Sequence, residues 1–159
     1  MIVVKGNLLE TDCFLIAHQV NCLGIMGGGV AKQIKGKWPI VYQEYKDFII
    51  DYEACNLKSA LGAVCATTVE GHSIINIFGQ ENISNSECMT DYKAVRGAFE
   101  DFISNYRCAL HIPWESQIPI AIPYKFGCGL AGGDWNIMTE VLEALEEQEN
   151  ILFIAYKLE

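Results

Sequence analysis

The chain has 159 residues, of which 51% are hydrophobic and 19% charged, with 11 Lys and Arg against 20 Asp and Glu. These proportions exclude a disordered chain and predict a single domain over residues 1–159 that buries a core of its own. The formal net charge of -9 repels phosphate backbones and leaves no basic patch, which disfavours nucleic-acid polymers as partners. A small anionic ligand is still allowed, because backbone N–H groups can hold phosphate.

Apolar runs fall short of the roughly 20 residues of a membrane span, and the start at Met1 has no signal-peptide profile. We therefore expect a cytoplasmic protein with no membrane partner. The seven cysteines are an odd number with no C-x-x-C pair and no zinc-like spacing, so we expect reduced thiols and no bound metal. Cys22 and Cys128 lie in glycine-rich loops, and they are the two whose reactivity is worth testing.

Strand-length apolar runs alternate with helix-length amphipathic runs, a pattern that predicts α/β layers around a buried sheet. The expected strands are Ile2 to Lys5, Phe14 to Gln19, Ala63 to Val69, Ser73 to Phe78, Ile118 to Pro123 and Ile151 to Tyr156. The expected helices are Gly28 to Lys35, Ile40 to Tyr52, Asp91 to Asn105 and Asp134 to Gln148. Asp91 and Asp134 are the expected N-caps of the last two. The apolar stripe of the last helix is expected at Ile137, Val141, Leu142 and Leu145.

Two glycine-rich loops each follow a buried strand and precede a helix, which is where ligands bind in open α/β sheets. The first contains Gly27, Gly28 and Gly29, and the second has four glycines between positions 127 and 133. Such loops let the backbone approach a ligand closely and point N–H groups at it. Neither loop matches the phosphate-binding motif G-x-x-x-x-G-K-[ST]. Gly27-Gly28-Gly29 is not G-x-G-x-x-G either, and the order of the expected strands and helices is wrong for a standard dinucleotide-binding fold. The loops therefore do not favour nucleoside triphosphate hydrolysis or hydride transfer as the function.

The chain resembles a macro domain in motifs that run in order over nearly its whole length. These are Val4-Lys5-Gly6-Asn7-Leu8, His18-Gln19-Val20-Asn21, Gly27-Gly28-Gly29-Val30-Ala31, Ile122-Pro123, Gly127-Cys128-Gly129-Leu130 and Tyr156. The resemblance is greatest to the branch of ADP-ribose 1''-phosphate phosphatases and terminal ADP-ribose-glutamate hydrolases. It implies a three-layer α/β/α fold with a mixed sheet of about six strands, and ADP-ribose or a related nucleotide as ligand, with no cofactor.

The resemblance also implies a role for each matching residue. Asn7 stands where the family usually has an aspartate that accepts a hydrogen bond from adenine, and Leu8 and Tyr156 would pack on the base. Asn21 matches the asparagine that bonds the distal ribose. The remaining contacts would come from backbone groups: Gly27, Gly28, Gly29 and Val30 around the distal ribose and its phosphate, and Gly127, Cys128, Gly129, Leu130 and Ala131 around the diphosphate.

The glutamate-deglycosylating members use a lysine after the fourth strand and an aspartate after G-C-G-L. Here Phe78-Gly79-Gln80 and Ala131 occupy those places, which argues against a lysyl intermediate. Asp134 is better explained as a helix cap than as a substitute, and the part played by Gln80 is open. His18 has the best claim to general acid or base chemistry, with Asn21 as a catalytic neighbour. A histidine that ends a buried strand can equally be a satisfied core group.

The first functional expectation is phosphate removal from ADP-ribose 1''-phosphate. The alternatives are an ADP-ribosyl hydrolase that works on ADP-ribosylated macromolecules without the lysine and aspartate, and a module that only binds ADP-ribose or a related signal. A structural domain with a vestigial pocket is disfavoured, because both loops keep several glycines although glycine loses the most conformational entropy on folding.

Overall fold

The computed structural model describes residues 1–84 and 86–159. The strands are β1 (Ile2–Lys5), β2 (Leu15–Val20), β3 (Val64–Val69), β4 (His72–Phe78), β5 (Ile118–Pro123) and β6 (Ile151–Lys157). The helices are α1 (Gly29–Lys37), α2 (Pro39–Ala54), α3 (Tyr92–Leu110) and α4 (Trp135–Glu149), with a short 3-10 helix η1 at Leu8–Glu10. The expected strands and helices are therefore found in the expected order, and η1 was not predicted.

The six strands form one mixed sheet in the order β1-β6-β5-β2-β4-β3. Every neighbouring pair is parallel except β3 and β4, which are antiparallel and joined by a tight hairpin. The two residues of its turn, Glu70 and Gly71, both have positive φ, at 48° and 79°, as a two-residue hairpin turn of the right twist requires. The carboxyl ends of the five parallel strands consequently meet at one edge of the sheet, and the glycine loops follow there.

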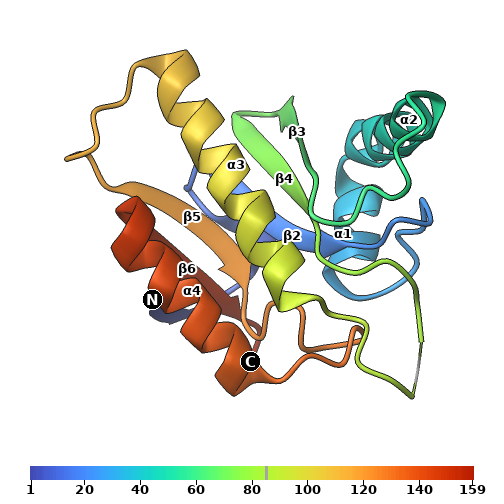
Figure 1. The fold of residues 1–159 in the computed structure, drawn as a ribbon. Coiled ribbons are helices and arrows are strands. Elements are labelled where there is room, and N and C mark those ends of the chain that lie inside the picture. The colour runs from blue at the N-terminus through green and yellow to red at the C-terminus, as the bar shows by residue number, and fades with distance from the viewer. Residues whose placement is uncertain (85) are drawn as a thin grey trace.

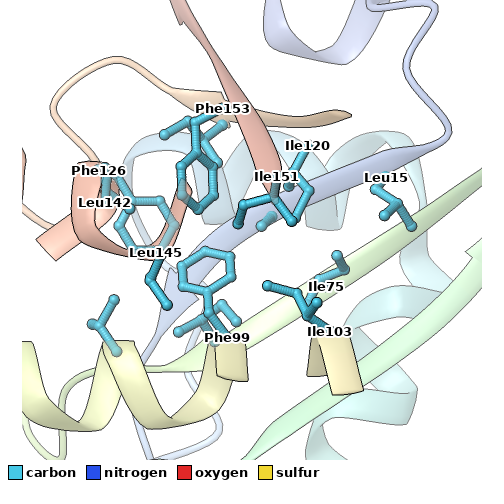
Figure 2. Packing of buried hydrophobic residues seen from close by; sticks show 14 of the residues in the cluster. Leu15, Ile75, Phe99, Ile103, Ile120, Phe126, Leu142, Leu145, Ile151 and Phe153 are labelled. Carbon is cyan, nitrogen blue, oxygen red and sulfur yellow. The ribbon is translucent and has the colours of Figure 1, made fainter. Parts of the chain in front are cut away.

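Helices cover both faces of the sheet, α3 and α4 on one and α1 and α2 on the other (Figure 1). Alternate side chains of each strand face opposite layers: Leu15 and Ala17 join the core under α3 and α4, while Ile16 and Val20 join the core under α1 and α2. Figure 2 shows Phe99, Phe126 and Phe153 meeting in the first of these cores. The three-layer α/β/α architecture expected from the sequence is thus confirmed.

Two helices differ from their expected extent or face. Helix α3 continues to Leu110, five residues beyond the expected end. In α4, Ile137 is 45% exposed, whereas Met138 is fully buried together with Leu142 and Leu145. The expected stripe was wrong at this position, because residues spaced four and then three apart share a helix face, and Met138 rather than Ile137 has that spacing to the other two.

Within the described ranges, no helix is long and apolar enough to cross a membrane.

Candidate functional site

Two adjoining cavities open at the carboxyl edge of the sheet. The first, of about 450 Å³, is lined by Asn7, Leu8, Leu9, Val30, Gln33, Pro123, Tyr124, Lys125, Tyr156, Lys157 and Leu158. The second, of about 430 Å³, lies between the two glycine loops and includes His18, Gln19, Asn21, Ile25, Gln80 and Ile83 in its walls. Val30, Pro123, Tyr124 and Lys125 belong to both, so the two cavities form one elongated groove.

The lining of this groove contrasts with the charge of the whole molecule. Although the chain carries 20 acidic residues, none of the residues that line either cavity is Asp or Glu. The cations among them are Lys125 and Lys157. A surface of net negative charge therefore has its carboxylates outside the groove, which leaves the groove suited to an anion.

The first glycine loop ends in a helix start that no side chain caps. Gly28 is the N-cap of α1 and makes no side-chain cap hydrogen bond, in contrast to the carboxylates of Asp91 on α3 and Asp134 on α4. In the described part of the chain, the N–H groups of Gly28, Gly29 and Val30 donate to no protein acceptor. These donors lie at the positive end of the helix dipole and line the second cavity, a combination that favours a bound anion.

The second glycine loop is folded tightly on itself. Gly127 has φ of 68° and its carbonyl accepts hydrogen bonds from the Gly133 N–H at 3.0 Å and the Thr90 hydroxyl at 2.6 Å. A Cβ at Gly133 would lie 2.5 Å from that carbonyl oxygen, so glycine is required there. In the residues that the structure describes, the N–H groups of Gly127, Gly129, Leu130 and Ala131 have no protein acceptor.

Cys128 differs from its neighbours in this loop. Its N–H donates to the Lys125 carbonyl at 2.8 Å, so it is not available to the diphosphate in the way that the family resemblance implied.

The two loops approach each other across the second cavity. The Leu130 side chain is 71% exposed, and its Cδ1 lies 2.6 Å from where a Cβ of Gly28 would be. Because Gly28 has no side chain, the Leu130 side chain has room to lie over the groove.

The first cavity collects the residues expected around a base. The Asn7 side-chain oxygen accepts a hydrogen bond from the Leu9 N–H at 3.0 Å and so caps η1, while Leu8 is buried. The Tyr156 hydroxyl is hydrogen-bonded to the Thr11 hydroxyl at 2.8 Å, which fixes the ring at the cavity wall. A flat aromatic wall with an amide beside it fits a nucleobase.

His18 is 1% exposed and lies in the wall of the second cavity. Its Nε2 is 2.6 Å from the Asn76 side-chain oxygen, and its Nδ1 is buried with no hydrogen-bond partner among the residues that the structure describes. Because an amide oxygen only accepts, Nε2 must carry the proton, which leaves the Nδ1 lone pair free. Burial lowers the pKa of His18 to about 4, and the bond to Asn76 opposes this in part, so the imidazole is neutral at pH 7.

Asn21 lines the second cavity and is 7% exposed. Its side chain organises its own loop, since Oδ1 accepts from the N–H groups of Leu23 and Ile25 and Nδ2 donates to the Ile25 carbonyl at 2.8 Å. The structure thus places His18 and Asn21 in the walls of one cavity.

No protein-family model matches the chain. An ADP-ribose 1''-phosphate phosphatase of Meyerozyma guilliermondii is 25% identical over 173 residues, covering 96% of this chain and 95% of the yeast protein. A DNA ADP-ribosyl transferase–DNA ADP-ribosyl glycohydrolase fusion protein of Thermosipho africanus is 25% identical over 154 residues and 85% of this chain. The chain spans only 36% of the length of the fusion protein.

Solved structures agree with these relatives. The macrodomain of Thermus aquaticus DarG superposes with a TM-score of 0.70 at 25% identity, covering 98% of this chain and 97% of that one. Thermosipho africanus DarTG in complex with ADP-ribose has a TM-score of 0.73 at 20% identity over 98% of this chain and 41% of that one. This chain has the macro-domain fold.

The macro domain has different residues where the deglycosylating members of the expected branch have their reacting pair. Gln80 lines the second cavity, and its side-chain oxygen accepts from Gln19 at 3.0 Å while its Nε2 donates to the Asn82 carbonyl. Ala131 is buried. Asp134 caps α4, accepting from the N–H groups of Asn136 and Ile137, so the helix-cap interpretation is confirmed.

The two loop cysteines of the macro domain are not activated thiols. Burial raises the pKa of Cys22. Burial, and to a smaller extent the negative charge of Asp134, raise the pKa of Cys128 to about 11. All seven cysteines are free. A nucleophilic thiol needs a lowered pKa, so neither Cys22 nor Cys128 fits a covalent mechanism.

Sequence reasoning missed the residues that connect the loops. Gln19 donates to both Gln80 and the Thr90 hydroxyl, and its side-chain oxygen lies against Gly79 and Gly127. The sequence signal for a role of Gln19 was its position at the end of a strand. Its hydrogen bond to Thr90 could not be predicted, because Thr90 is 71 residues away in sequence. Tyr124 and Lys125 follow β5 directly and could have been selected by the strand-end rule.

Proposed function

We propose that this macro domain binds ADP-ribose along the joined groove. The adenine lies in the first cavity against Tyr156, the diphosphate accepts from the free N–H groups of the two loops, and the distal ribose enters the second cavity beside Asn21. The observation that carries this proposal is a groove without carboxylates in a chain of net charge -9, with uncapped backbone donors on both sides. The ADP-ribose complex of the related Thermosipho protein supports it.

The reaction we propose first is removal of phosphate from ADP-ribose 1''-phosphate. Water attacks phosphorus, the bond from phosphorus to the ribose oxygen breaks, and ADP-ribose and inorganic phosphate are released. His18 is the candidate base, because it lines the second cavity and its neutral ring has one nitrogen without a hydrogen-bond partner among the described residues. The near full-length similarity to the Meyerozyma phosphatase supports this choice.

The rim of the second cavity favours a second candidate, removal of ADP-ribose from a macromolecule. Ile25 and Ile83 are each 47% exposed and Leu130 is 71% exposed, and all three line this cavity. An apolar rim suits a flat base or an apolar side chain on the distal ribose better than a bare phosphate dianion. Relatives named as DNA ADP-ribosyl glycohydrolases support it. The chemistry would have to proceed without the lysine and aspartate pair.

Three further expectations belong to the same proposal. Residues 1–159 act as one domain, because β1 near the start of the chain pairs with β6 near its end. The protein works in the cytoplasm, because seven free cysteines fit a reducing compartment. Unmodified nucleic-acid polymers are not partners, because of the net charge.

The test is calorimetric titration with ADP-ribose, followed by assays for phosphate release from ADP-ribose 1''-phosphate and for ADP-ribose release from modified DNA or protein. Tyr156→Ala should weaken ADP-ribose binding, while Tyr156→Phe keeps the ring and should bind nearly as the wild type does. His18→Ala should abolish turnover and retain binding. Binding with neither product would identify a module that only holds ADP-ribose, and no binding would refute the proposed ligand.

A further inference from the structure

Helix α2 supports the first glycine loop from behind through a buried tyrosine. Tyr45 is fully buried, and its hydroxyl lies 2.7 Å from the Asn21 backbone carbonyl and 2.9 Å from the Asn21 side-chain oxygen. Burial raises the pKa of Tyr45, so the hydroxyl keeps its proton and donates it. The single hydroxyl proton of Tyr45 is thus shared between the backbone carbonyl and the side-chain oxygen of Asn21.

This contact determines what Asn21 has left to offer a ligand. The side-chain oxygen of Asn21 accepts from the Tyr45 hydroxyl, the Leu23 N–H at 3.0 Å and the Ile25 N–H at 3.4 Å. An amide oxygen has two lone pairs, and the two N–H groups together with the shared hydroxyl proton of Tyr45 occupy both. The nitrogen donates to the Ile25 carbonyl and has a second hydrogen.

We propose that Tyr45 is a positioning residue that acts through Asn21: it turns the carboxamide oxygen into the loop, so that Asn21 meets the distal ribose as a hydrogen-bond donor. The inference rests on the proposed binding of ADP-ribose in the groove. It assigns Tyr45 a part in recognising the distal ribose alone, since Asn21 belongs to the second cavity and not to the first.

The chain offers a matched control on the same helix. Tyr42 also donates from α2 to the first loop, from its hydroxyl to the Gly24 carbonyl at 3.2 Å. None of the hydrogen bonds of the Asn21 side chain among the described residues involves Tyr42. Tyr45→Phe and Tyr42→Phe therefore each remove one hydroxyl behind the same loop. Only the first removes a hydrogen bond to Asn21.

The binding experiment compares ADP-ribose with ADP, which lacks the distal ribose. We expect Tyr45→Phe to weaken ADP-ribose binding roughly 3- to 10-fold, the loss of about one hydrogen bond, and to leave ADP binding unchanged. Tyr42→Phe should not change the ratio of the two affinities. An unchanged ratio in Tyr45→Phe, or an equal loss for both ligands, would overturn the proposal. Thermal unfolding verifies that both variants are folded.

A second measurement needs no ligand. Amide hydrogen exchange at Leu23 and Ile25 reports whether the Asn21 oxygen still holds the loop. We expect faster exchange at both N–H groups in Tyr45→Phe than in Tyr42→Phe. If the wild type fails to bind ADP-ribose, the proposed function is refuted, and this exchange comparison still decides whether Tyr45 positions Asn21. Equal exchange in the two variants would show that it does not.

Discussion

At the scale of single residues, the burial of His18 has a cost that depends on pH. The ring is 1% exposed and its pKa is lowered to about 4 from 6.5, chiefly by burial. Between these two values the unfolded chain binds a proton that the folded chain excludes. The free energy of unfolding therefore rises with pH across this window and falls as the solution is acidified.

We expect the free energy of unfolding of the wild type to fall by up to about 3 kcal/mol between pH 6.5 and pH 4 on account of His18. His18→Gln cannot be protonated and should lack this part of the pH dependence. Urea unfolding of both proteins across the window measures the difference. Parallel pH curves for the two proteins would show that His18 is protonated normally in the folded state.

Two glycines of the second loop make a matched pair. A Cβ at Gly133 would lie 2.5 Å from the Gly127 oxygen, whereas one at Gly129 would meet nothing within 4 Å. We expect Gly133→Ala to destabilise the fold by about 1–3 kcal/mol and to weaken ADP-ribose binding, because the backbone must move. Gly129→Ala should change stability by less than about 0.5 kcal/mol. Thermal unfolding and calorimetric titration compare the two, and equal effects would contradict this account of the loop.

At the scale of elements, a single arginine holds the ends of two helices opposite the groove. The Arg107 side chain on α3 donates to the carbonyls of Pro113 and Ser116 and to those of Glu149 and Asn150 at the end of α4, over distances of 2.8–3.1 Å. It is 7% exposed and lies over the Trp114 ring. These contacts explain why α3 continues to Leu110, past the end that periodicity predicted.

Arg107→Met should therefore lower the free energy of unfolding by about 2–4 kcal/mol, because four carbonyls lose a charged donor. Arg96→Met is the control, since the Arg96–Glu100 ion pair is exposed, with side-chain exposures of 44% and 36%, and should cost no more than about 1 kcal/mol. Chemical denaturation measures both. ADP-ribose binding should be retained in Arg107→Met below its unfolding transition, because the residue is remote from the groove.

At the scale of the whole molecule, charge is distributed unevenly. Three lysines, Lys32, Lys35 and Lys37, lie on α1. The ammonium groups of Lys35 and of Lys46 in the middle of α2 lie 3.9 and 4.6 Å from the centre of the Tyr42 ring. The net charge nevertheless stays at -9, and the long-range field is negative.

We expect no binding of a short unmodified DNA duplex at physiological salt, measured by fluorescence anisotropy, even if ADP-ribosylated DNA proves to be a substrate. In that case recognition would come from the ADP-ribose and not from the phosphate backbone. Salt-dependent binding of the unmodified duplex would contradict this expectation, and loss of that binding in Lys35→Glu would locate it on α1.

Most of what could be predicted about the helices and strands depends on interactions between residues close in sequence. Strand alternation, helix periodicity and the Asp91 and Asp134 caps act over a few residues, so the strands, the helices and the two glycine loops were found close to their expected places. The family motifs placed His18, Asn21 and the loops at one site. The exceptions were η1, the end of α3 and the exposed Ile137, each of which depends on a local cap or on contacts with other elements.

The sequence by itself determined the layered α/β class, the two backbone-lined loops and the negative net charge, because each depends on residue types and short spacings. Only the tertiary structure decided that His18 is neutral, since burial lowers its pKa. It also decided which ring nitrogen carries the proton, since the partner Asn76 is 58 residues away in sequence. It also decided that the Cys128 N–H is occupied and that Tyr45 on α2 directs the Asn21 side chain. Hydrogen-bond partners and burial arise where distant segments pack together, and no short pattern in the chain encodes them.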